Sequence, residues 1–66
     1  MTTANNSQWI SFEEKLPPED ILVETKIDDL DGIRNETKLI RQGNLMYTSD
    51  KIMYVYYTPT HWRFIS

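Results

Sequence analysis

The sequence of 66 residues contains no cysteine, a single histidine and no long hydrophobic run. Without cysteine there is no disulfide framework and no thiolate metal site, and one imidazole makes a zinc site only with carboxylates beside it. No stretch of 18 apolar residues and no charged-then-apolar leader is present, so neither a membrane span nor export is encoded. We therefore expect a cytoplasmic protein that holds no metal and no other cofactor.

Positive charge is also scarce, because seven Lys and Arg side chains face ten Asp and Glu, for a net charge of −3. The imbalance is uneven along the chain. Residues 1–36 contain nine acidic and three basic side chains, whereas residues 37–66 contain one and four. General nucleic-acid binding requires a basic stripe, so this composition argues against it. The acidic part instead predicts a basic partner.

The length allows one domain, close to the lower limit at which a single core offsets the entropy of the chain. Residues 1–8 are polar and contain nothing to bury, so we expect a disordered tail followed by one small domain over residues 9–66. Nearly every large apolar side chain of that domain needs cover, within the fold or at an interface. A homodimer is one way to provide it.

Patterning predicts a mainly β fold with an α+β margin. Residues 21–27 form the first strand, with odd positions inward, and residues 28–32 carry the Asp and Gly of a hairpin turn. The return strand, residues 33–41, alternates poorly and suggests an edge. A third strand at 45–47 and a closing strand at 62–65 complete a small antiparallel sheet of four or five strands, a meander approaching an SH3-like partial barrel. Ser11 and Glu14 match a capping box for one short N-terminal helical turn, which the proline pair after Leu16 limits.

The densest aromatic stretch, residues 51–58, predicts the central strand of this sheet. Its odd face and its even face would both be apolar or aromatic, and a sheet so small has too little chain to cover both. Tyrosine tolerates an interface because its ring is buried while its hydroxyl stays near water. The even face is therefore the predicted partner-binding surface, with the residues Ile52, Tyr54 and Tyr56.

The acidic turn supplies the other predicted binding residues, Asp28, Asp29 and Asp31. They resemble part of a calcium loop, but the first ligand of that register would fall at position 27, which is Ile. A solvated turn that steers a basic partner is the better interpretation.

Three ring-bearing side chains have a structural and a functional interpretation. Trp9 and Trp62 could stack on a nucleotide base, yet tryptophans that bracket a small domain usually close its core. His61 could transfer protons only beside a nucleophile or carboxylate in a pocket, so we expect it to pack or to fix backbone.

Four short segments carry a resemblance to a known family: Trp9-Ile-Ser11, Leu16-Pro17, Ile21-Leu-Val23 and Thr60-His-Trp62. Together they resemble the phage and prophage family catalogued as domain of unknown function 551, over roughly residues 9–62. Residues 63–66 depart from the proline-rich tail of that family. The resemblance implies a small bacteriophage accessory protein that works inside the bacterial host.

The expected function is non-enzymatic, because Ser, His and Cys constellations for catalysis are missing. We expect a phage protein that binds, and inhibits or redirects, a host protein such as a defence or transcription component. One alternative is a protein that sequesters a nucleotide signal, using aromatic rings for stacking and Lys38, Arg41 or Arg63 for phosphate. Another is a structural homo-oligomer or virion accessory protein.

Overall fold

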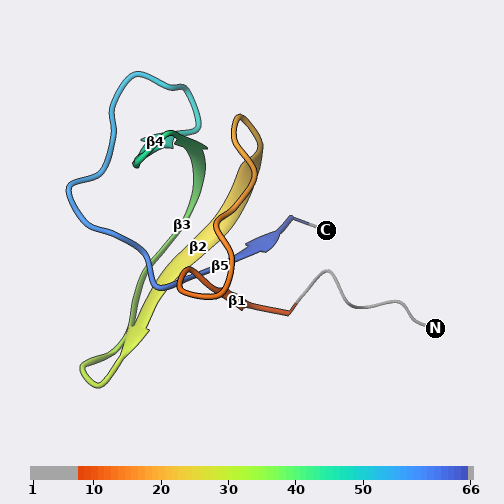
Figure 1. Cartoon of the computed structure of the whole chain (residues 1–66). Helices are drawn as coiled ribbons and strands as arrows, with labels where there is room; N and C mark the ends of the chain where they lie inside the picture. Colours follow the sequence, from red (N-terminus) through yellow and green to blue (C-terminus); the bar gives the residue numbers. More distant parts are fainter. Residues whose placement is uncertain (1–7, 66) are drawn as a thin grey trace.

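The computed structural model describes residues 8–65 and contains one open antiparallel sheet of five strands (Figure 1). The predicted small antiparallel β fold is therefore confirmed. The predicted tail lies outside the described residues except for Gln8. The strands stand in the order β1-β5-β2-β3-β4. Their bounds are β1 Ile10–Ser11, β2 Leu22–Asp29, β3 Gly32–Gln42, β4 Leu45–Thr48 and β5 His61–Phe64.

The core lies on one face of the three inner strands. Alternation along β2 places Val23, Thr25 and Ile27 on this face, and all three are buried. Trp62 of β5 pairs with Thr25 and is fully buried, and Leu39 of β3 pairs with Val23. The predicted inward residues of the first strand are thus buried, except that Ile21 precedes the strand and is exposed.

The hairpin between β2 and β3 forms at the predicted turn. Asp29 pairs with Gly32, whose φ of 109° lies in the region that favours glycine. A bulge follows where Lys26 faces the step between Arg34 and Thr37, and Asn35 has a φ of 58° there.

The prediction that β3 is an edge strand is wrong, because β3 lies between β2 and β4. Its pairing with β4 covers only the last four residues, from Leu39 to Gln42. The exposed first half of β3 explains why its sequence alternates like an edge.

The predicted helical turn is not formed as a helix, and residues 8–65 contain none. Ser11 instead begins a single turn, in which its carbonyl accepts hydrogen bonds from the N–H groups of Glu14 and Lys15. The Ser11 hydroxyl accepts from the N–H of Glu13. The Lys15 carbonyl then accepts a 2.8 Å bond from the indole of Trp62, which ties this turn to the core.

The prediction of a central strand at residues 51–58 is also wrong. This stretch is an irregular connection that leaves β4, runs beside it briefly and returns to β5 in a wide path (Figure 1). Because β5 pairs with β2, the chain must cross from the β4 edge back over β3 and β2, which no strand of the sheet can do. The centre of the sheet is β2.

Candidate functional site

Residues 52–57, called here the aromatic arc, form the most exposed apolar part of the molecule. Ile52 is 78% exposed and Tyr56 is 89% exposed, while Tyr54 is 42% exposed. These are the three residues predicted as a partner-binding face. They are exposed because the segment is a connection outside the sheet, and not because one face of a central strand lacks cover.

The arc is held at its start by β4. The N–H of Thr48 donates to the carbonyl of Met53, and the N–H of Val55 donates to the carbonyl of Met46. The Asp50 carboxylate accepts bonds from the Thr48 hydroxyl and from the N–H of Ile52. These two bonds, the hydroxyl first, lower the pKa of Asp50.

Three tyrosines form a ladder on the arc and on β4. The ring centroids of Tyr47 and Tyr54 are 5.8 Å apart, and those of Tyr54 and Tyr56 are 5.5 Å apart, both in edge-to-face geometry. Such pairs contribute about 0.5–1.5 kcal/mol beyond their buried area. The exposed rings are therefore held in place before any partner arrives.

An open groove of about 340 Å³, called here the arc groove, lies between the arc and the turn that follows β1. Phe12 and Leu16 line it from that turn, and Leu45 and Met46 line it from β4. The sequence analysis did not select these residues. Leu16 beside the proline pair was the available signal, since its exposed apolar side chain has no place in a helix or a strand.

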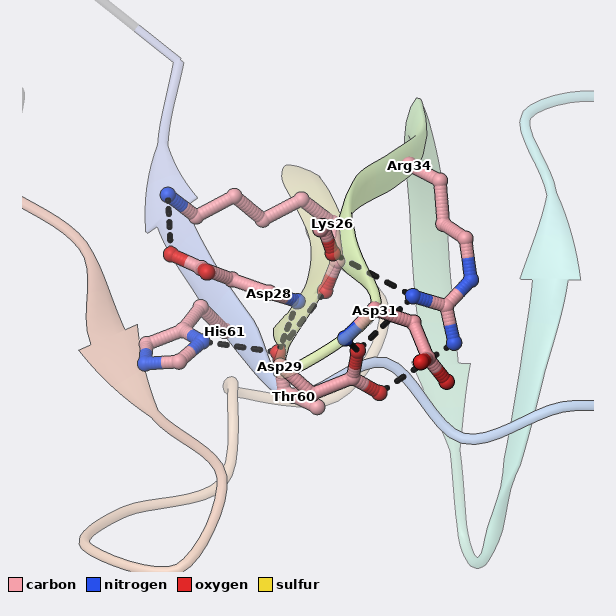
Figure 2. A network of polar contacts seen from close by, with 8 residues as sticks. Lys26, Asp28, Asp29, Asp31, Arg34, Thr60 and His61 are labelled. Atoms are coloured by element: carbon pink, nitrogen blue, oxygen red, sulfur yellow. Dashed lines mark hydrogen bonds and ion pairs between the residues drawn. The ribbon is translucent and has the colours of Figure 1, made fainter.

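The predicted acidic residues are largely neutralised by neighbouring cations (Figure 2). Asp28 lies 3.3 Å from the ammonium group of Lys26, and both oxygens of Asp29 accept bonds from the Arg34 guanidinium. The bond from Arg34, followed by the bond from the N–H of Asp31, lowers the pKa of Asp29. Asp31 alone of the three acidic residues has no ion pair within residues 8–65.

The acidic turn and the aromatic arc are not brought together. Asp29 pairs with Gly32 at one end of β3, while Tyr47, the base of the ladder, pairs with Ile40 near the other end. Eight residues of strand separate these positions, a distance of roughly 25 Å. The six predicted binding residues thus form two separate surfaces.

Thr60 and His61 anchor the far end of the connection (Figure 2). The Thr60 hydroxyl accepts a 2.8 Å bond from the N–H of Asp28 and lies 2.7 Å from Nδ1 of His61. The N–H of Thr60 donates to the carbonyl of Lys26, and its own carbonyl accepts from Phe12. His61 therefore supports a residue that joins three segments of backbone.

The cations and rings suggested for a nucleotide are mostly engaged elsewhere. Arg41 donates to the carbonyl of Pro17, and Arg63 donates to Glu24. Trp62 is buried, and the Trp9 ring has Lys26 and Arg63 at 4.4 and 4.3 Å from its centroid. Both tryptophans thus take part in packing.

Within residues 8–65, no group of three or more His, Asp or Glu side chains is placed to hold a metal ion. The same part of the chain has no helix with the length and apolar character needed to cross a membrane. No protein-family model matches the sequence, and neither a curated protein nor a solved structure matches the chain.

Proposed function

We propose that this chain is a small non-enzymatic bacteriophage accessory protein that binds a host protein and inhibits or redirects it. The binding surface is the aromatic arc with its groove. The setting inside a bacterial host cell rests on the resemblance of the four short segments described above.

One observation carries the proposal, which is the exposure of Ile52 and Tyr56 in a chain with few apolar side chains to spare. Burying such a side chain is worth about 1.5–3 kcal/mol, and the fold leaves this gain unused. Exposed clustered apolar side chains mark interaction sites in soluble proteins. Tyrosine rings fixed in a ladder lose little conformational entropy on binding, which suits them to recognition.

Affinity capture from bacterial lysate, followed by binding measurements with the purified captured protein, tests the proposal. The arc variant carries Ile52→Ala and Tyr56→Ala. Its matched control carries Leu30→Ala and Ile33→Ala, because both residues are exposed apolar side chains of the β2–β3 hairpin. An interfacial aromatic anchor contributes about 2 kcal/mol or more, so the arc variant should bind at least roughly thirtyfold more weakly.

The control variant should bind as the wild type does. Equal losses in both variants would contradict the proposal, as would full binding by the arc variant. Sedimentation of the wild-type protein separates the structural alternative: a dimer that the arc variant dissolves would mean that the surface serves self-association.

A further inference from the structure

Ion pairing consumes most of the positive charge of the described chain. Five ion pairs connect basic side chains to acidic ones within residues 8–65. They are Lys26–Asp28, Arg34–Asp29, Arg41–Glu19, Lys51–Asp20 and Arg63–Glu24. The remaining charges decide which surfaces attract a charged partner.

The acidic side chains that have no ion pair within residues 8–65 gather mainly around the arc groove. Glu13 and Glu14 directly follow Phe12, which lines one wall, and Asp50 stands at the start of the arc on the other. Lys15 is the single cation on the same turn that has no ion pair in this part of the chain. Three negative charges and one positive charge leave this rim with a net charge of −2.

We propose that the arc groove binds a segment of a partner protein in which apolar or aromatic side chains alternate with Lys or Arg. This inference rests on the proposed function and adds the chemistry of its partner. The apolar groove receives the partner's apolar side chains, while the acidic rim faces its basic ones.

The charge of the rim also decides between a foreign partner and a second copy. A two-fold contact through the arc would bring Glu13, Glu14 and Asp50 toward the same residues of the other copy. Like charges placed together oppose association, whereas a basic segment would be attracted to the same rim. The volume of about 340 Å³ holds a few side chains and is too small for a whole helix, which is about 10–12 Å across.

The test is selection of a random peptide library on the intact protein, followed by titration of a synthesised enriched peptide at ionic strengths from ~0.01 to ~0.15 M. Enriched peptides should combine Lys or Arg with Leu, Phe, Tyr or Trp. The rim variant carries Glu13→Gln and Glu14→Gln, which remove two exposed charges that make no ion pair. Its matched control carries Asp31→Asn and Glu36→Gln, with the same change in net charge on the hairpin side of the sheet.

At low salt the rim variant should bind the enriched peptide roughly 2- to 30-fold more weakly and with a smaller salt dependence, since exposed charges act weakly and are screened. The control should stay within about twofold of the wild type. Enriched peptides that lack basic residues, equal effects of the two charge variants, or a library that yields no peptide dependent on the arc would each overturn the inference.

The arc variant keeps this inference separate from the proposed function. Peptide binding that requires Ile52 and Tyr56 but ignores Glu13 and Glu14 would refute the basic partner and leave the arc as the binding surface. Peptide binding that ignores Ile52 and Tyr56 would refute both. A concentration-dependent dimer that the arc variant dissolves would assign the groove to a second copy and overturn the basic-partner inference.

Discussion

Replacing Thr60 with valine should weaken the whole domain, although the two side chains have nearly the same shape. The hydroxyl of Thr60 accepts the N–H of Asp28 at 2.8 Å and contacts Nδ1 of His61 at 2.7 Å. Valine cannot accept a hydrogen bond, so the half-buried N–H of Asp28 loses its partner. An unsatisfied buried donor costs about 1–3 kcal/mol.

This loss is large for so small a domain. At about 0.05–0.15 kcal/mol per residue, 66 residues give a total stability of roughly 3–10 kcal/mol. Each kcal/mol lost lowers the melting temperature of a domain of this size by about 4–8 °C. The Thr60→Val variant should therefore melt well below the wild type and remain folded at low temperature.

Thr60→Ser is the matched control, because serine keeps the hydroxyl and loses one methyl group, worth about 0.8 kcal/mol when buried. Thermal and urea unfolding followed by tryptophan fluorescence measures both variants. Hydrogen exchange provides a local readout: the amide of Asp28 should exchange faster in the valine variant than in the serine variant. Equal stability of the two variants, or unchanged protection of the Asp28 amide, would refute this account of Thr60.

Three further predictions concern the core, the acidic turn and the hairpin. Trp62→Ala removes a fully buried side chain at a cost of about 3–5 kcal/mol and deprives the Lys15 carbonyl of its indole donor, so circular dichroism should show an unfolded or barely folded chain; a melt close to that of the wild type would contradict the assignment of Trp62 to the core. Arg34 lowers the pKa of Asp29, so the native state binds fewer protons than the unfolded state; the Asp29 contribution is complete above the ordinary value of 3.8 and disappears as the pH falls through the lowered pKa. Asp29→Asn should accordingly reduce the loss of stability in acid titrations below pH 3.8, and an identical acid limb would count against the ion pair. Gly32→Ala forces an L residue to a φ of 109° and should cost about 1–3 kcal/mol in urea unfolding, although no atom crowds the added methyl group; wild-type stability would mean that the turn relaxes freely.

Local patterns in the sequence predicted much of the sheet. The turn residues of 28–32 and of 42–44 set the two hairpins, because glycine supplies the backbone angles that these turns need and neighbouring strands pair across them. Alternation along the first strand identified Val23, Thr25 and Ile27 as core residues, since successive side chains of a strand point to opposite faces. The closing strand and its buried Trp62 also followed from local composition.

The candidate site was only partly predictable. Ile52, Tyr54 and Tyr56 were selected because too many apolar side chains were crowded into one stretch, and the structure leaves them exposed. The reason given for selecting them was wrong, since the stretch is a connection and not a strand. The acidic turn looked free in the sequence because its cations, Lys26 and Arg34, reach it through pairing of side chains across the bulged hairpin.

The sequence by itself determined a small, acidic, cysteine-free β domain with two hairpins and a tryptophan core, because composition, turns and alternation act over neighbouring residues. Only the tertiary structure decided that β5 pairs with β2, and this pairing makes residues 51–58 a crossing segment in spite of their strand-forming composition. The same long-range choice placed Phe12 and Leu16 opposite the arc and created the groove between them. Pairing between distant segments depends on which contacts bury the most apolar surface in the whole domain, and no local pattern contains that comparison.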